Sequence, residues 1–258
     1  MTTHTRGQRS MRLPWLFERR DDRDFPFYDG EPVTVAAWKW LVIILGCVVG
    51  FIALTTIPSP DNVSGLLSRA LFPAIMLVVF ILLTGRYWSA IFRKMTGGDW
   101  LNMVVFGLLT LVVSFIVGAV VRAIFGASAN TAADGLAAGG PIEIVAFLVG
   151  TALQLLGEEL FTILPFLAVM SLLHGAGVGR NTSAILAWLI TAVWFGAAHL
   201  PTYDWNVVQA FVGIGAARLV LTLAFMRTKN IAVSTGAHII NDWIGFGIVA
   251  ATSAALIA

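Results

Sequence analysis

Charged side chains are scarce in this sequence. Only 12% of its 258 residues are Asp, Glu, Lys or Arg, about half of the roughly 25% that is usual for a soluble domain. Hydrophobic residues make up 58%. A soluble protein of this length has to cover its surface with polar side chains, so the composition argues against a water-soluble fold. The lipid bilayer is the solvent that the composition indicates.

Other features are missing as well. A single cysteine, Cys47, lies in an apolar run, which excludes an intrachain disulfide and favours a small core residue. No alternation of polar and apolar residues is long enough to predict a sheet. The sequence also lacks His-Glu-x-x-His and Gly-x-Gly-Asp, so zinc proteases of the site-2 type and presenilin-like aspartyl proteases are disfavoured.

Basic residues are concentrated at the N-terminus. The net charge is +2, and six of the sixteen lysines and arginines lie within residues 1–23. They do not recur on a later face with interleaved aromatics, so the sequence predicts no nucleic-acid partner. Such a terminal excess predicts instead a cytoplasmic N-terminus in the plasma (cell inner) membrane. More than thirty residues precede the first apolar run, which favours a retained anchor over a cleaved signal peptide.

Apolar runs of spanning length predict an all-α, polytopic membrane protein with helices around a polar intramembrane cavity. The predicted spans are 37–57, 66–84, 101–121, 142–173, 184–200, 207–226 and 231–256. The fourth would extend about 48 Å at 1.5 Å per residue, against roughly 30 Å of hydrocarbon. It is therefore tilted, broken near Pro165, or two shorter spans, which makes seven helices or eight.

The predicted organisation is a charged cytosolic extension, residues 1–35, followed by a helical membrane domain, residues 36–258. Arginines and lysines fall in alternate connections, whereas residues 58–65 and 201–206 contain none. This pattern agrees with a cytoplasmic N-terminus. Residues 127–140 are rich in Ala, Gly, Ser and Asn, which predicts an extracytoplasmic loop.

Several ionisable side chains occur within the apolar runs. Glu158 and Glu159 lie at the midpoint of the fourth run, His199 ends the fifth, and His238 enters the seventh. Such groups are costly in a membrane and normally face a cavity with partners. Helical spacing adds further polar neighbours. These are Gln154, one turn before Glu158, and Asn241 and Asp242, about one turn after His238.

This set of side chains could hydrolyse a substrate. A desolvated glutamate can act as a general base for water, while histidine and asparagine can stabilise a developing oxyanion. Alternatively, His199, His238 and Glu158 could hold a zinc ion that activates the water. Residues of this kind can also simply pin helix packing, but five or more polar groups on three helices favour a functional site.

The same residues resemble a known pattern. The CAAX protease and bacteriocin-processing family of intramembrane proteases, also called the abortive-infection or type II prenyl-endopeptidase-like family, carries a Glu-Glu pair, Phe-xxx-His and His-xxx-Asn/Asp on separate helices. Glu158-Glu159, Phe195 to His199 and His238 to Asp242 match it, within about residues 145–245. The resemblance implies that a glutamate activates water, that both histidines bind or stabilise the reacting centre, and that Asp242 or Asn241 assists.

One position departs from the pattern. The family places an arginine four residues after the second glutamate, where this sequence has Ile163. Arg218 lies about eight residues inside the sixth span, and a cation at that depth should seek a carboxylate. We therefore expect Arg218 to pair with Glu158 or Glu159, unless its long side chain snorkels to the interface.

The depths of the two histidines conflict with a common site. Counted at about 1.5 Å per residue, His199 lies some 22 Å from the cytoplasmic edge and His238 some 11 Å. Helix tilt, or a fifth span that begins after Ala184, must supply the difference of about 10 Å.

Three functions are compatible with these residues. The first is an intramembrane endopeptidase whose substrate is a peptide or membrane protein near the lipid. The second is a scaffold or immunity protein that keeps the fold, has lost turnover, and acts through a membrane-protein partner. The third is an ion or proton transporter that uses the polar interior.

Overall fold

The computed structural model of the chain describes residues 12–19, 21–128, 136 and 140–257, and every regular element in these ranges is a helix. This confirms the all-α prediction. The longer helices are α1 (Ala37–Thr56), α2 (Asn62–Thr84), α3 (Gly97–Phe125), α5 (Pro141–Gly175), α6 (Arg180–Ala198), α7 (Gly215–Thr228) and α8 (Ile231–Ile257). Short helical turns occur at η2 (Gly85–Ile91), η4 (Pro201–Tyr203) and η5 (Gln209–Ile214).

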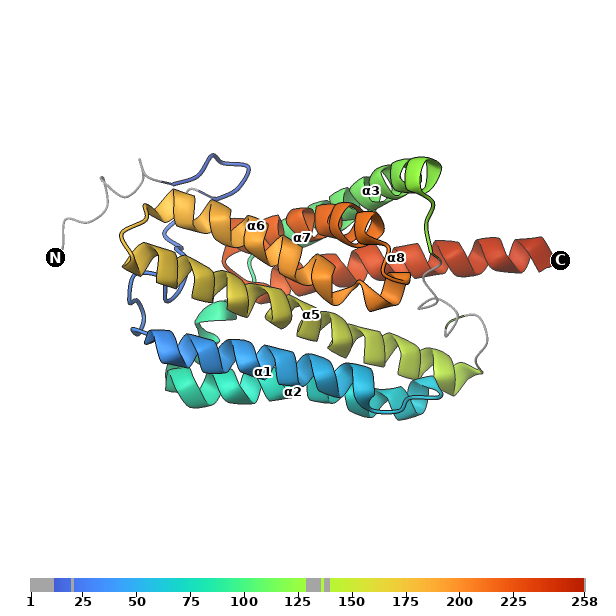
Figure 1. The fold of residues 1–258 in the computed structure, drawn as a ribbon, viewed down its shortest axis with the longest axis horizontal. Helices are drawn as coiled ribbons and strands as arrows, with labels where there is room; N and C mark the ends of the chain where they lie inside the picture. The colour runs from blue at the N-terminus through green and yellow to red at the C-terminus, as the bar shows by residue number, and fades with distance from the viewer. Residues whose placement is uncertain (1–11, 20, 129–135, 137–139, 258) are drawn as a thin grey trace.

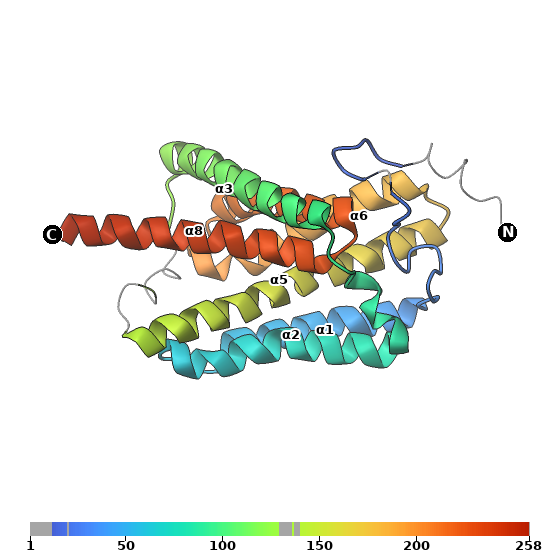
Figure 2. The ribbon, with the colours of Figure 1, turned by 180° about the vertical axis from the view of Figure 1, so that it is seen from behind.

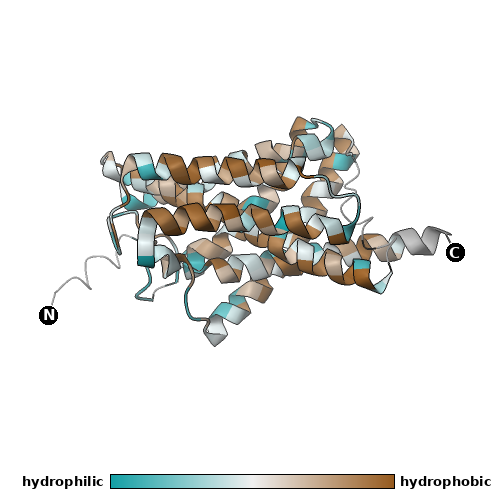
Figure 3. Cartoon of the chain, turned by 90° about the horizontal axis from the view of Figure 1, so that it is seen from below, coloured by the Kyte–Doolittle hydropathy of each residue, from teal (hydrophilic) through white to brown (hydrophobic). Residues whose placement is uncertain are grey.

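The protein is an integral membrane protein. Six helical stretches of the described residues are long and apolar enough to cross a bilayer: α1, α2 with η2, α3, α5, α6, and η5 with α7. Figure 3 shows the apolar faces of the helices along the length of the bundle. The seventh predicted span corresponds to α8, which is 27 residues long and lies lengthwise in the bundle (Figure 1). Residues 127–140, predicted as a loop, lie largely outside the described residues.

Helix α5 forms the centre of the molecule. In its most apolar window 72% of the residues are buried, against 22% for α3. The pair α1 and α2 covers one side of α5, and α6, α7, α8 and α3 lie on the other (Figures 1 and 2). A helix buried on all sides has to be apolar all round, so its polar residues stand out.

The long fourth segment is one helix. It runs through Pro165 for 35 residues, so a division into two spans does not occur. Proline cannot donate a backbone hydrogen bond to the carbonyl of residue i−4, which here is Phe161. The indole Nε1 of Trp194 on α6 donates to that carbonyl oxygen at 3.1 Å. A neighbouring helix thus satisfies the acceptor that proline leaves free, as membrane helices require.

The described part of the N-terminal extension packs against one end of the bundle. Within residues 12–35, here called the N-terminal segment, the side chains of Leu13, Phe25, Phe27 and Val35 are buried. Figure 1 places this segment at the end where α5 and α6 meet, opposite the C-terminus. The segment therefore belongs to the folded core, whereas residues 1–11 lie outside the described residues.

A buried ionic cluster holds the N-terminal segment in place. Glu18 accepts hydrogen bonds from Arg180 at the start of α6, at 2.7 and 2.9 Å, and from Lys229 between α7 and α8, at 2.5 Å. Asp24 also bonds to Arg180. Lys229 has φ 51°, so it ends α7 in the left-handed region. We call Glu18, Asp24, Arg180 and Lys229 the Glu18 cluster.

The close approach of α3 and α8 depends on a glycine. A Cβ added to Gly107 would lie 2.9 Å from the carbonyl oxygen of Ala237, the neighbour of His238. Small residues permit such approaches between membrane helices. Gly118, on the same helix, has nothing within 4 Å of its Cβ position.

Gly107→Ala should destabilise the protein by about 1–3 kcal/mol, because the added methyl group meets backbone that cannot move aside cheaply. Gly118→Ala is the matched control and should stabilise α3 by up to about 1 kcal/mol. Thermal unfolding of the detergent-solubilised variants measures both. Equal stabilisation by the two substitutions would contradict the close approach.

The Glu18 cluster predicts a loss of stability in acid. Burial alone would raise the pKa of Glu18, but the hydrogen bonds from Arg180 and the charge of Lys229 outweigh it and lower the pKa from 4.5 to about 2. A carboxyl group whose pKa is lowered by folding stabilises the protein at every pH above its pKa in the unfolded state. That contribution disappears as the pH falls from about 4.5 toward 2. Its size is about 3 kcal/mol. The melting temperature of Glu18→Gln should already be lower at neutral pH and should change less over this window.

Candidate active site

The two adjacent glutamates of α5 occupy different environments. The side chain of Glu159 is fully buried, whereas that of Glu158 is 13% exposed and lines a cavity. Successive residues differ by about 100° around a helix, which accounts for the division. Gln154, one turn earlier, donates through Nε2 to Glu158 Oε1 at 2.9 Å. Glu158 is therefore held in a fixed orientation at the cavity wall.

Arg218 of α7 neutralises the buried glutamate. Its Nη2 lies 2.7 Å from Glu159 Oε1, and both side chains are fully buried. Arg218 Nε donates to Thr222 Oγ1 at 3.2 Å, and the guanidinium carbon lies 5.0 Å from the Phe195 ring centre. The expected pairing of Arg218 with the glutamate pair is confirmed, and Glu159 is the partner. Ile163, where the family pattern has arginine, is buried in the apolar core.

His238 of α8 connects the two glutamates. Its Nδ1 lies 3.0 Å from Glu159 Oε1, while its Nε2 lies 3.7 Å from Glu158 Oε2 and 3.7 Å from Asp242 Oδ1. Asn241 donates to the same Asp242 oxygen at 2.6 Å. Because an ionised carboxylate only accepts hydrogen bonds, Nδ1 of His238 carries the proton toward Glu159. Its Nε2 faces the cavity side of the site.

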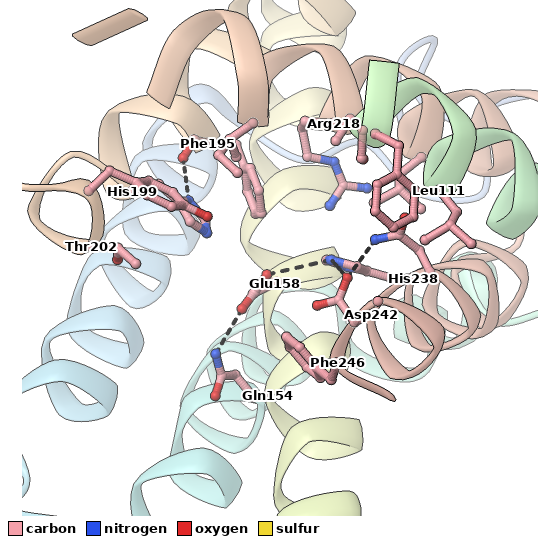
Figure 4. A pocket seen from close by; sticks show the side chains of 18 of the residues that line it. Leu111, Gln154, Glu158, Phe195, His199, Thr202, Arg218, His238, Asp242 and Phe246 are labelled. Atoms are coloured by element: carbon pink, nitrogen blue, oxygen red, sulfur yellow. Dashed lines mark hydrogen bonds and ion pairs between the residues drawn. The ribbon is translucent and has the colours of Figure 1, made fainter. Parts of the chain in front are cut away.

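His199, the C-cap of α6, approaches from the other side. Its Nδ1 lies 2.8 Å from the carbonyl oxygen of Phe195, so this nitrogen carries a proton and Nε2 is the variable one. The Phe195 ring lies 4.4 Å from the His199 ring and 6.5 Å from the His238 ring, centre to centre. Figure 4 shows His199 and His238 on opposite sides, with Glu158 between them. Phe195 thus contacts both histidines and Arg218.

These side chains surround one cavity of about 400 Å³. Its ionisable and amide side chains are all predicted residues: Gln154, Glu158, His199, Arg218, His238, Asn241 and Asp242. The structure therefore brings the predicted site residues of α5, α6, α7 and α8 together. Glu159 lies behind the wall, in contact with Arg218 and His238.

The conflict over the depths of the histidines has a physical explanation. Helix α6 begins at Arg180, before Ala184 rather than after it, so a late start of that span is the wrong explanation. Helix α8 instead begins inside the bundle: Thr228, Lys229 and Asn230 are at most 1% exposed. Figures 1 and 2 show α8 starting short of the ends of α5 and α6. The N-terminal segment fills the remaining space.

Unpartnered polar atoms concentrate at this site. Seven buried side-chain nitrogen or oxygen atoms of the described residues lack a hydrogen-bond partner, and four belong to Glu159, Arg218 and Asn241. One of these four, Arg218 Nη2, is nevertheless in the ion pair with Glu159. Buried polar atoms are normally satisfied, so such a group needs an explanation. Water or a bound polar group in the cavity would supply partners for Arg218 and Asn241, which line it.

His199, His238 and Glu158 are the predicted ligands of a zinc ion. With their Nδ1 atoms engaged, both histidines have the donor chemistry that metal ligands often show. However, no group of three or more His, Cys, Asp or Glu side chains among the described residues has the geometry of a metal site. A zinc ion held by His199, His238 and Glu158 therefore stays a prediction.

Sequence reasoning missed the lining contributed by α3 and by the connection after α6. Leu111, Ser114 and Phe115 line the cavity from α3, and Thr202 and Tyr203 line it from η4. Single apolar or hydroxyl residues in an apolar helix carry no distinguishing signal. Thr202 and Tyr203 could have been suspected, because they follow His199 directly.

The fold and the site define an integral membrane protein with a carboxylate–imidazole cluster in its interior. Residues 140–244 match the model of a family described as "Type II CAAX prenyl endopeptidase Rce1-like". This match confirms the resemblance that the three motifs predicted, over less than half of the chain. No curated protein and no solved structure matched the sequence.

Removing Arg218 should destabilise the protein strongly. Arg218→Met leaves Glu159 as an uncompensated buried charge, which costs about 3–5 kcal/mol. The double variant Arg218→Met/Glu159→Gln removes both charges and should recover much of that loss. A double-mutant cycle from thermal unfolding measures the coupling. Additive effects of the two single substitutions would show that the ion pair contributes nothing.

Proposed function

We propose that the protein is an intramembrane endopeptidase of the CAAX-protease type, which hydrolyses peptide bonds near the membrane with water activated by a glutamate. The proposal rests on the different environments of the two adjacent glutamates of α5. Arg218 and His238 bind Glu159 in the core, while Glu158, oriented by Gln154, faces the cavity and has no arginine or lysine partner among the described residues. One carboxylate is thus structural and the other is available as a base.

In the proposed reaction, Glu158 takes a proton from a water molecule in the cavity, and that water attacks the scissile carbonyl carbon. His199 in its protonated form, with Nδ1 bound to the Phe195 carbonyl, directs Nε2–H toward the developing oxyanion, and the Asn241 amide is a second donor. Glu158 then returns the proton to the leaving amine as the C–N bond breaks. Glu159 and Asp242 orient His238 beside the base.

The orientation proposed for the protein places it in the plasma (cell inner) membrane, with the N-terminal segment on the cytoplasmic side. The described lysines and arginines gather at that end of the bundle, in the N-terminal segment and the connections beside it. At the opposite end only Arg69 and Arg122 are found among the described residues. An excess of basic residues marks the cytoplasmic side of membrane proteins.

Glu158→Gln should abolish peptide hydrolysis, since an amide cannot accept the proton from water. The expected loss is about 10²–10⁴-fold in kcat, with the melting temperature preserved because the Gln154 contact can be kept. Glu143→Gln, on the same helix but outside the cavity, is the matched control and should retain full activity.

The assay needs the purified protein in lipid and a library of peptides presented at the membrane. Full activity of Glu158→Gln would contradict the role of the base. If neither wild type nor Glu143→Gln cleaves any peptide, the scaffold function with a membrane-protein partner is favoured. An ion flux in liposomes that Glu158→Gln abolishes would indicate transport instead.

A further inference from the structure

The cavity has a closed floor and an open mouth. Arg218, Leu221 and His238 form the floor and are at most 5% exposed. Phe115 and Val249, which also line the cavity, are 51% and 46% exposed, and Thr202 is exposed too. Exposed lining residues mark the route by which a molecule reaches the interior.

All three mouth residues lie at the same end of the bundle. Phe115 and Val249 each lie 18 residues beyond the first residue of their helices, α3 and α8, which is about 27 Å along the axis. Thr202 belongs to η4, which follows the C-terminal end of α6. This end is opposite the N-terminal segment (Figure 1), and Figure 4 shows Thr202 beside His199 at the cavity.

The other end of the site is sealed. Between the cavity and the N-terminal segment, α7 presents Ala224, Phe225 and Met226, all fully buried. Closer to the N-terminal segment, Glu18 binds Lys229 just before the start of α8. A polypeptide from that side would have to displace both the packed apolar core and the buried ion pairs.

We propose that the substrate enters from the end opposite the N-terminal segment, which the distribution of basic residues makes extracytoplasmic. The substrate class is then a membrane-anchored polypeptide whose scissile bond lies at the outer side of the membrane. Phe115 and Val249 at the mouth are apolar and exposed where lipid would surround them, which suits an apolar segment arriving through the bilayer. The choice of substrate rests on the proposed peptidase function, whereas the side of access does not.

Cysteine labelling tests the side of access directly. The only native cysteine, Cys47, is fully buried, so the maleimide should not label it. It can also be removed as Cys47→Ala. Thr202→Cys places a thiol at the mouth. Ser89→Cys is the matched control. Ser89 is an exposed residue of η2, at the end of the bundle where the N-terminal segment lies. Intact cells and inverted membrane vesicles are treated with a membrane-impermeant maleimide.

Thr202→Cys should be labelled in intact cells and protected in inverted vesicles, and Ser89→Cys should show the reverse. Labelling of Thr202→Cys only in inverted vesicles overturns the proposal, and so does its failure to label in either preparation, since an open mouth must react. If peptidase activity is found, modification of Thr202→Cys from outside should abolish it, while modification of Ser89→Cys should leave it intact. The labelling pattern stands even if no peptidase activity is found, so failure of access and failure of the proposed function are distinguishable.

Discussion

The ion pair between Glu159 and Arg218 is the interaction on which the rest of the site depends. An ionised carboxylate in the membrane interior is tolerated only with a partner, and here one guanidinium provides it at 2.7 Å. Because Arg218 neutralises Glu159, the same carboxylate oxygen can also bind His238. Helices α5, α7 and α8 are thereby joined at one atom. The adjacent Glu158 is left to face the cavity with its charge uncommitted to packing.

This arrangement also explains how the chain can do without the arginine of the family pattern. The positive charge comes from α7 rather than from the next turn of α5, where Ile163 packs among apolar side chains. A cation contributed by a different helix adds a tertiary constraint that an arginine on α5 would not supply. Its guanidinium also packs on Phe195, the ring that contacts both histidines. In this chain the arginine that neutralises Glu159 thus comes from a different helix.

The sequence was sufficient to predict the helices from their apolar runs. It was also sufficient to predict the glutamates and histidines of the site and the pairing of Arg218, because each of these residues is an energetic anomaly in an apolar segment. The relative depths of His199 and His238 could not be predicted. They depend on the start of α8, which lies inside the bundle because the N-terminal segment and Glu18 cover it. That contact joins residues about 200 positions apart, and no local pattern around Glu18 indicates it. The roles of Ser114 and Thr202 at the cavity were hidden for a similar reason.

The proline of α5 has a consequence beyond the continuity of that helix. The Phe161 carbonyl that Pro165 leaves free is two residues from Glu159, and the indole that binds it belongs to Trp194, the neighbour of Phe195. The freed carbonyl is an acceptor at a defined position on α5, so the Trp194 indole joins α6 to α5 at this level. A missing hydrogen bond in one helix thus provides an attachment point for another. The attachment lies two residues from Glu159 along α5 and five residues from His199 along α6, so it supports the site from both helices.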